Sequence, residues 1–489
     1  MILPEMGERE VNAVFTTGIY CRAGCTGRPK PSNRAAYPSA VAAQAAGFRP
    51  CLLCRPDRRA DVLIDGATPE VVRQALMLIS DGFMDQNTAA ALGGRIGISP
   101  RHLNRLFEDH IGATPALIAQ SRRAHFARRL LDETDLTITD ISSASGFRSI
   151  RQMNRVMRQV FRFTPSELRR KRRKADRLVV DGGLRLRIPT PSGFEFGAVL
   201  EYLAPRAIPG VESVVDGVYR RVTNTCGYPG VIEVSAGPDS SGLELVAHLP
   251  SFNGLLGDVA RCRSLFGMEV DISGARDDLA DDPLLAPLIS SRPGLTVPGA
   301  WDRFETAIRI ILGQQVTVRG ASTLAGRITR ELGIPVPGLG EIGLGFLFPS
   351  AHRLAEADLK EMGISRSRSL ALRSFARVVD DGSLDLYDHS ELPALLSRLQ
   401  QLPGIGPWTA NMLAMRVFGH MDAFPSTDLG LRNAVAKLLP PGAPTGEIVE
   451  KTAQNWRPWR SLAFTYLLRS VSAPVETDAA RNPVVAPVG

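Results

Sequence analysis

Two groups of side chains in this sequence have the types and the spacing that a chemical site requires. The first is a set of four cysteines that form two close pairs, Cys21 with Cys25 and Cys51 with Cys54. Four thiolates complete the tetrahedral shell that Zn²⁺ takes in structural sites, and the ion stabilises a segment too small to fold around a core of its own. The spacing therefore predicts one zinc ion held by these four residues.

The second group lies around a carboxylate near the C-terminal end. Two helices, expected over residues 393–401 and from Pro407 onward, flank a short turn that contains Gly404 and Gly406. The glycines permit a tight reversal and leave backbone N–H groups free at the start of the second helix, where an anion such as a DNA phosphate can bind. Asp428 then begins a further expected helix, a position that suits an N-cap. We interpret the unit as a helix-hairpin-helix followed by a carboxylate at the start of a helix.

Length and composition indicate the setting in which these groups act. A chain of 489 residues is long enough for about three or four domains. Its net charge of +8 suits a polyanionic partner. No apolar run approaches the ~18 residues of a membrane span, and the N-terminus lacks a signal-peptide pattern. We therefore expect a cytoplasmic protein that works on the nucleoid, with double-stranded DNA as its partner and no contact with a membrane.

The residues around the cysteine pairs resemble a known family. Residues 17–21 and 47–54 are similar to the N-terminal domain of the Ada methyl-phosphotriester repair proteins. The resemblance implies a zinc domain over residues 1–62 in which Cys21 accepts a methyl group from a DNA phosphotriester and is consumed in doing so. Such a transfer needs an electron-rich thiolate, which a zinc-bound thiolate cluster provides. A purely structural zinc module that holds DNA stays open as an alternative, and the spacing of the cysteines alone favours it.

An internal repeat occupies residues 67–175. An Asn-Arg pair followed by Thr-Pro occurs at Asn104 and again at Asn154, each time after a glycine turn between short helical patterns. This arrangement predicts two helix-turn-helix units with recognition helices near residues 99–107 and 149–157. Paired units of this kind resemble the AraC-type DNA-binding domain, which implies operator DNA as a partner. Each candidate groove residue, taken alone, is better explained as a solvated helix residue. The candidates are Arg101, His102, Asn104, Arg148, Arg151 and Gln152.

The rest of the chain divides by its pattern of apolar residues. Short alternating runs separated by glycine and proline predict an antiparallel α+β domain over residues 178–300. Helical periodicity predicts an all-helical domain over residues 301–472. The tail, residues 473–489, has no periodicity and is expected to be disordered. The expected fold class is a multidomain chain, mainly α with α+β.

The hairpin and the carboxylate after it resemble the helix-hairpin-helix DNA glycosylases, above all the DNA-3-methyladenine glycosylase II family. The resemblance implies that Asp428 is the catalytic carboxylate of an enzyme that releases 3-methyladenine and 7-methylguanine by hydrolysing the N-glycosidic bond. Relatives that also cut the backbone carry a lysine where this chain has Trp408, and an indole cannot form a Schiff base, so we expect base excision alone. No cysteine cluster follows Asp428, which argues against an iron–sulfur cluster. The resemblance places the damaged base against Trp408, Met412 and Leu468, and it places Gln315 on the loop that fills the gap left in the duplex by a flipped-out base.

Together the two halves predict a DNA alkylation-repair protein that joins a glycosylase to an Ada-like regulatory half. Two alternatives remain. One is a transcription regulator of the adaptive response to alkylation whose glycosylase is weak or decayed, although the intact hairpin, Trp408 and Asp428 argue against decay. The other is a glycosylase whose zinc module only holds DNA.

Overall fold

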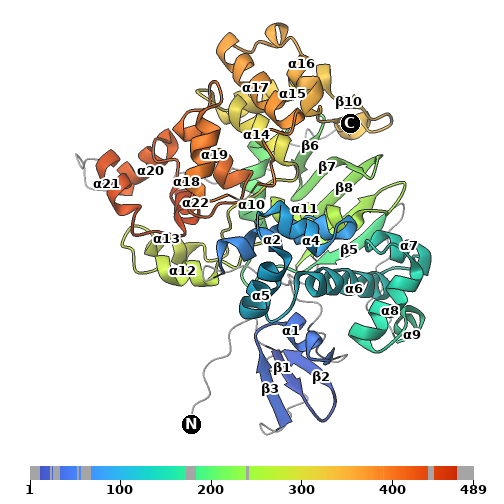
Figure 1. Cartoon of the computed structure of the whole chain (residues 1–489). Coiled ribbons are helices and arrows are strands. Elements are labelled where there is room, and N and C mark those ends of the chain that lie inside the picture. The colour runs from blue at the N-terminus through green and yellow to red at the C-terminus, as the bar shows by residue number, and fades with distance from the viewer. Residues whose placement is uncertain are drawn as a thin grey trace, which may run out of the picture.

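The computed structural model describes most of the chain. The described residues are 11–22, 25, 33–51, 54, 56, 68–171, 183–237, 242–388, 390–438 and 445–470. The tail that we expected to be disordered, residues 473–489, lies outside them. Figure 1 shows a small N-terminal sheet module at one end, the helices of the repeat beside it, a larger sheet in the middle and the C-terminal helices at the other end. In this described part of the chain no helix is long and apolar enough to cross a membrane.

The N-terminal module is a four-stranded sheet with one short helix. Its strands are β1 (Val11–Val14), β2 (Ile19–Arg22), β3 (Arg34–Tyr37) and β4 (Arg49–Pro50), and its helix is α1 (Ala40–Ala45). The strands pair in the order β3-β1-β2-β4. The core of this module is small, with Val11, Ala13, Tyr20 and Ala43 as its buried members. A core of this size does not hold a domain together alone, which agrees with the metal site inferred from the cysteines.

The repeat forms two helix-turn-helix units, as predicted. Its helices are α2 (Glu70–Ser80), α3 (Phe83–Gln86), α4 (Ala89–Arg95), α5 (Pro100–Ile111), α6 (Pro115–Glu133), α7 (Ile138–Ala144), α8 (Ile150–Phe161) and α9 (Pro165–Arg170). The recognition helices α5 and α8 begin at serine N-caps, Ser99 and Ser149, whose hydroxyls accept a hydrogen bond from the backbone N–H three residues on. Both helices run about one turn further than predicted, because Ile111 and Phe161 extend their buried faces.

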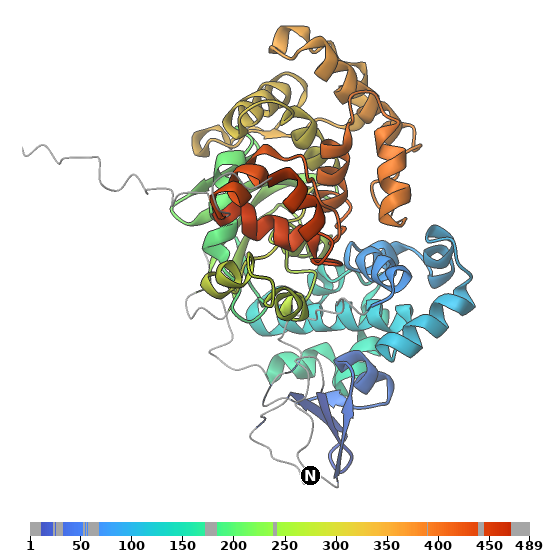
Figure 2. The ribbon, with the colours of Figure 1, turned by 90° about the vertical axis from the view of Figure 1, so that its left-hand side faces the viewer.

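A five-stranded antiparallel sheet follows, as predicted. Its strands are β5 (Leu184–Ile188), β6 (Glu212–Val215), β7 (Val218–Thr225), β8 (Tyr228–Ala236) and β9 (Leu243–His248), in the order β5-β9-β8-β7-β6. The helical segments around it are α10 (Phe196–Leu203), η4 (Ala204–Arg206), α11 (Leu255–Leu265), α12 (Ser273–Leu279) and α13 (Ala286–Ser291). One continuous apolar core joins this sheet to the second helix-turn-helix unit. Leu130 and Met153 from the helices share that core with Leu186 and Ile232 from the sheet, and both views show these helices beside the sheet (Figures 1 and 2).

The C-terminal part is helical with one exception. Its helical segments are α14 (Arg303–Leu312), α15 (Val318–Leu332), η5 (Gly340–Ile342), α16 (Ala351–Glu356), η6 (Lys360–Met362), α17 (Arg366–Asp380), α18 (Leu392–Gln400), α19 (Pro407–Arg416), α20 (Leu429–Leu438), α21 (Thr445–Thr452) and α22 (Arg460–Ser470). Between α15 and α16 the chain forms a short hairpin of β10 (Ile334–Pro335) and β11 (Phe346–Leu347). The prediction of an all-helical domain was wrong at this point, because the hairpin packs against the sheet through Val336 and Leu344.

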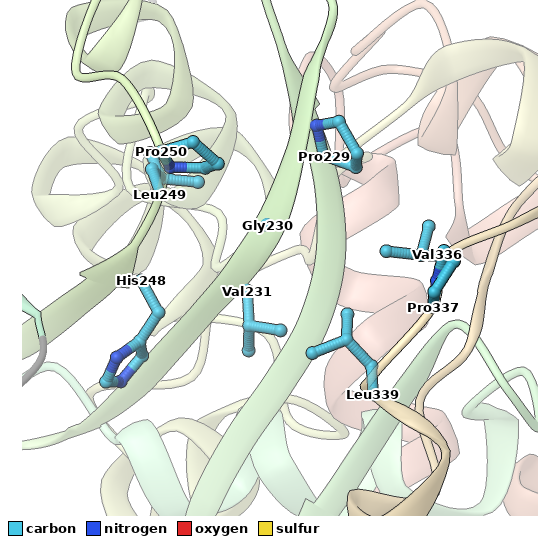
Figure 3. A pocket seen from close by; sticks show the side chains of 9 residues that line it. All are labelled: Pro229, Gly230, Val231, His248, Leu249, Pro250, Val336, Pro337 and Leu339. Carbon is cyan, nitrogen blue, oxygen red and sulfur yellow. The ribbon is translucent and has the colours of Figure 1, made fainter.

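An open hollow lies where this hairpin meets the sheet (Figure 3). It is lined by Pro229, Gly230, Val231, His248, Leu249, Pro250, Val336, Pro337 and Leu339. The lining is almost wholly apolar and includes no carboxylate and no cysteine. None of the residues that the sequence singled out lines it, so the chemistry must be sought elsewhere.

Candidate active site and metal site

The helix-hairpin-helix is built from α18 and α19 with an exposed turn between them. Gly404 adopts φ +76°, and a Cβ atom at this position would lie 2.7 Å from the Cβ of Ala371. Only glycine therefore combines the left-handed conformation with the close approach to α17. Gly406 is exposed and caps α19, whose first turn leaves backbone N–H groups free for a phosphate. The turn thus has the form that the sequence predicted for an anion-binding hairpin.

Asp428 is held by two hydrogen bonds at the start of α20. Its Oδ1 accepts from the backbone N–H of Leu431 at 2.9 Å, which makes it the N-cap of that helix. Its Oδ2 accepts from Nε1 of Trp408 at 2.8 Å. The two interpretations of this residue are therefore compatible, since one oxygen caps the helix while the other is fixed by the indole. The residue is only partly buried, so the carboxylate is a fixed anion that a substrate can reach.

Of the other predicted pocket residues, Met412 lies close to Trp408 and Leu468 lies close to the carboxylate of Asp428. Met412 follows Trp408 by one turn on α19, so the two share a helix face. Leu468 on α22 lies against Gly430, where an added Cβ would be 3.0 Å from both Asp428 Oδ1 and Leu468 Cδ2. The structure thus brings an aromatic face and an aliphatic side chain to the same carboxylate.

Gln315 lies in the loop between α14 and α15. It is exposed and adopts φ +54°, a conformation that a side chain other than glycine rarely takes. Its neighbour Gln314 ties the loop to the hairpin, because Nε2 of Gln314 donates to the Gly404 carbonyl at 2.8 Å and to Thr409 Oγ1 at 2.9 Å. A strained, exposed residue on an anchored loop is the arrangement that a wedge into duplex DNA needs.

Sequence reasoning missed two residues that the sheet domain contributes to this region. The guanidinium of Arg206 stacks on the ring of Tyr202, 3.9 Å from its centroid. Arg416 donates a hydrogen bond to the hydroxyl of the same tyrosine. Burial, and then the neighbouring Arg309, lower the pKa of Arg206 to about 10, while the charge of Asp428 opposes this shift. Arg206 is therefore a desolvated cation within electrostatic reach of the carboxylate. No local motif marks it, because it lies in the preceding domain, far from Asp428 in the sequence.

The hydrogen bond between Trp408 and Asp428 leads to a prediction. Trp408→Phe keeps an aromatic face for the base but removes the only donor to Oδ2 that the described residues provide. A hydrogen bond to a charged group contributes ~1.5–3 kcal/mol, so we expect the single-turnover rate of base release to fall about tenfold with little change in DNA binding. Trp459→Phe is the matched control, because Trp459 donates to Asp278 Oδ2 at 2.9 Å outside the site. Equal rates for Trp408→Phe and the wild type would show that the bond plays no part in excision.

The predicted groove residues of the helix-turn-helix units fall into two groups. Arg101 and Arg151 are exposed on α5 and α8 and are available to DNA. Arg148 instead donates to the carbonyl of Gln86 at 2.8 Å, and its backbone N–H donates to Gln152 Oε1 at 2.9 Å. Both of these side chains therefore already have intramolecular roles. His102 and Asn104 are partly buried on α5.

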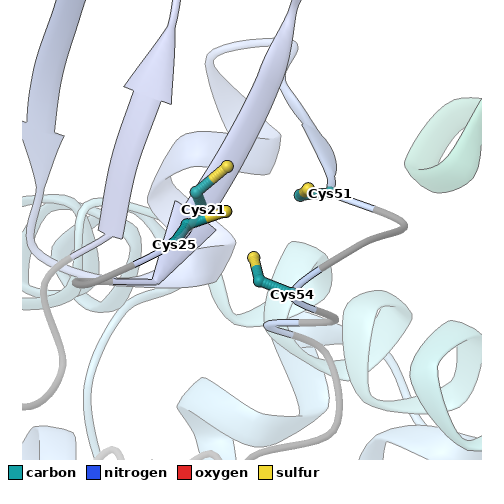
Figure 4. A group of neighbouring side chains, drawn as sticks. All are labelled: Cys21, Cys25, Cys51 and Cys54. Carbon is teal, nitrogen blue, oxygen red and sulfur yellow. The ribbon is translucent and has the colours of Figure 1, made fainter. Parts of the chain in front are cut away.

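The four cysteines converge as their spacing predicted (Figure 4). Their sulfur atoms all lie within 4.8 Å of one another. The parallel pairing of β2 with β4 brings the two pairs together, and the N–H of Cys51 donates to the Tyr20 carbonyl at 3.0 Å. Burial and then the neighbouring thiols raise the pKa of Cys21, and burial raises the pKa of Cys54 to about 11. Thiols this close ionise together only beside a cation, so the donor set fits Zn²⁺.

Comparison with known proteins agrees with this geometry. Four family models match successive parts of the chain: the metal binding domain of Ada (residues 5–57), a helix-turn-helix domain (92–171), the AlkA N-terminal domain (184–302) and the HhH-GPD superfamily of base excision DNA repair proteins (308–458). The chain is 36% identical to the probable bifunctional transcriptional activator/DNA repair enzyme AlkA of Mycobacterium tuberculosis, over 95% of this chain and 93% of that protein. It is 32% identical to DNA-3-methyladenine glycosylase 2 of Escherichia coli, over 56% of this chain and 93% of that protein. The fold also resembles 3-methyladenine DNA-glycosylase from Archaeoglobus fulgidus, with a TM-score of 0.50 and 23% identity over 58% of this chain and 97% of that one.

Proposed function

This chain belongs to the family of bifunctional transcriptional activator/DNA repair enzymes of the AlkA type, and we propose that it excises 3-methyladenine and 7-methylguanine from double-stranded DNA with Asp428 as the catalytic carboxylate. It is a DNA glycosylase of alkylation repair with an Ada-like, DNA-binding regulatory half. The observation that carries the assignment of the site is the carboxylate of Asp428, fixed by Trp408 and Leu431 beside the hairpin.

The proposed reaction follows from the charges in the site. An alkylated purine turned out of the duplex stacks on the electron-rich face of Trp408, and its positive charge favours this contact. When the C1′–N bond breaks, its electron pair goes to the base, which leaves neutral, and the sugar takes the positive charge. Asp428 stabilises that charge, and water adds to C1′ and releases a proton to solvent. Trp408 offers no amine, so the sugar–phosphate backbone stays intact. Met412, Leu468 and Gln315 are proposed to shape the pocket and the wedge.

For the N-terminal half we propose one Zn²⁺ ion bound by the four cysteines, no iron–sulfur cluster in the chain, and Cys21 as the methyl acceptor. The bound ion supplies the positive charge that keeps the thiolates ionised. The Cys21 sulfur attacks the methyl carbon of a phosphotriester, an S–C bond forms, the C–O bond breaks and a phosphodiester anion leaves. Exposure does not single out Cys21, which is 4% exposed. The choice among the four sulfurs rests on the match of residues 17–21 to the Ada pattern.

The two complete helix-turn-helix units support a second role in transcription, in which operator DNA binds α5 and α8. Arg101 and Arg151 are the proposed contacts, with His102 and Asn104 beside them. We place the protein on the nucleoid for the same reason. We propose that the expected domain boundaries after residues 62, 175, 300 and 472 separate parts with different functions. They do not separate parts that each have a hydrophobic core of their own.

The experiment that tests the excision proposal is direct identification of the products. Full-length protein is incubated with methylated duplex DNA, and the released bases are identified by mass spectrometry. We expect 3-methyladenine and 7-methylguanine as free bases and abasic sites in an unbroken strand. Strand cleavage would contradict the monofunctional mechanism, and the absence of any released base would contradict the proposed substrates.

A further inference from the structure

The helix-turn-helix half contacts the glycosylase in two places: its second unit shares the core of the sheet, and its first unit is docked on the C-terminal helices through side chains. Arg303 at the start of α14 pairs with Asp81 at 3.0 Å, and Arg95 at the end of α4 pairs with Asp385. Val270, between the sheet and the C-terminal helices, packs against the cores of both parts. The first unit is therefore in contact with the segments before and after the hairpin rather than joined to the glycosylase only through the chain.

Arg73 on α2 makes the most buried of these contacts. It is 8% exposed. Glu70 holds its guanidinium from one side, with Nε of Arg73 donating to Glu70 Oε2 at 2.8 Å. From the other side Nη1 of Arg73 donates to the carbonyl of Gly419 at 3.3 Å. A bidentate guanidinium is rigid, so the carbonyl that it binds is held in place.

Gly419 itself is shaped for this contact. It adopts φ +72°, and a Cβ at this position would lie 2.9 Å from Cε of Met77, one turn after Arg73 on α2. The backbone of Gly419 thus lies directly against α2 of the helix-turn-helix half. The next residue, His420, is 5% exposed, and burial lowers its pKa to about 4, so it is neutral and does not take over the role of the arginine.

Residues 417–428, which we call the carboxylate segment, run from the end of α19 to Asp428. On the glycosylase side the segment is fastened by Ser461, whose hydroxyl oxygen lies 2.8 Å from the carbonyl oxygens of both His420 and Ala423, so that its one proton is shared between them. Asp422 is paired with Arg460 at 2.6 Å. Arg73 contacts the same segment at Gly419, near its N-terminal end. The segment that leads to the catalytic carboxylate is therefore in contact with both α22 of the glycosylase and α2 of the helix-turn-helix half.

We propose that Arg73 is a positioning residue for base excision, which acts through Gly419 on the segment that carries Asp428. The proposal rests on the assignment of Asp428 as the catalytic carboxylate. It assigns the helix-turn-helix half a part in the repair reaction itself, beyond the binding of DNA. A displacement of α2, for example when the recognition helices engage DNA, is transmitted through the same contact to the carboxylate segment. Small displacements of a catalytic group lower rates by large factors, up to ~10²-fold for about 1 Å.

The test compares single-turnover base release by full-length variants. Arg73→Met keeps the unbranched stem and removes the guanidinium. We expect the rate to fall about tenfold, while the Kd for a duplex that contains an abasic-site analogue stays within about twofold of the wild type. Arg73→Lys still offers a donor to the Gly419 carbonyl, so its rate of base release should lie between the rates of the wild type and Arg73→Met. An unchanged rate in Arg73→Met, or a parallel loss of DNA affinity, would overturn the inference.

Two further variants separate this inference from its rivals. Asp81→Asn breaks a different contact across the same interface, and we expect it to excise at the wild-type rate. If it slows excision as much as Arg73→Met, docking in general matters and the specific role of Arg73 is refuted. If Arg73→Met has a lower melting temperature, the rates of base release are compared at a temperature below the midpoint of its thermal unfolding. Equal rates for the wild type, Arg73→Lys and Arg73→Met at that temperature overturn the inference. Asp428→Asn in the same series tests the carboxylate independently, because normal excision by that variant removes the assignment of Asp428 whatever Arg73 does.

Discussion

Asp428→Asn is expected to abolish base release while the binding of damaged DNA is retained. Asparagine has the shape of aspartate and is itself a good N-cap, so the hydrogen bond from Leu431 at the start of α20 can be kept. What is lost is the negative charge beside the sugar, and that charge matters in the transition state rather than in docking. Removing one such stabilising group typically costs ~10²–10³-fold in rate. The measurement is single-turnover release of 3-methyladenine, with affinity for an abasic-site analogue measured alongside.

A matched control separates catalysis from helix capping. Asp302 is the N-cap of α14, where its side chain accepts from the backbone N–H of Glu305 at 2.8 Å. It has the same local role as Asp428 but no indole partner. Asp302→Asn should therefore release bases at close to the wild-type rate. If Asp428→Asn and Asp302→Asn behave alike, the carboxylate of Asp428 is a cap and no more, and the catalytic assignment is wrong.

The parts of this structure that depend on local pattern were predictable from the sequence. The first helix of the hairpin, expected over residues 393–401, is observed as Leu392–Gln400, and the helix expected to begin at Asp428 is observed as Leu429–Leu438. Helical periodicity, glycine turns and capping residues act within a few residues of one another, so they can be identified without knowing the rest of the fold. The four cysteines were predictable for a related reason, since ligand spacing follows from the geometry of one ion.

The parts that depend on distant packing were not predictable. Helix α6 contains Arg122, Arg123, Arg128 and Arg129, which suggest a solvated surface, yet it is buried on several sides. It contacts the N-terminal module and the neighbouring helices, and it shares one core with the sheet. Periodicity shows which residues are apolar but not which element covers them. The division into independent domains therefore missed the shared core.

The same limit applies to the candidate site. Trp408 and Asp428 are close in the sequence, and both were singled out there, although the hydrogen bond between them was not predicted. Arg206 and Tyr202 come from another domain, and Arg73 comes from the other half of the chain. Each of these three contributes through a long-range contact, with the Asp428 charge, with Arg416 or with the Gly419 carbonyl. Such contacts have no signature in a single sequence.

Methylation of wild-type protein by DNA that contains methyl-phosphotriesters is expected to place one methyl group on Cys21 and none on the other three zinc ligands. The transfer converts a thiolate into a thioether and removes one negative charge from a site where four thiolates outweigh one Zn²⁺ ion. The site then repels DNA phosphates less, so DNA binding by the adjacent helix-turn-helix units should tighten. A change of ~1–3 kcal/mol corresponds to roughly a five- to 150-fold gain in affinity. Peptide mass spectrometry identifies the modified residue, and binding before and after methylation gives the affinity ratio.

The chain contains its own control for this experiment. Cys226 is an exposed free thiol on the sheet domain, outside the cluster. Non-specific alkylation would modify Cys226 first, because an exposed thiol is the easiest to reach. Methylated Cys21 with unmodified Cys226 therefore indicates transfer directed by the site. If all four ligands stay unmodified while zinc remains bound, the N-terminal module only holds DNA, and the affinity of the helix-turn-helix units should then be the same before and after exposure to methylated DNA.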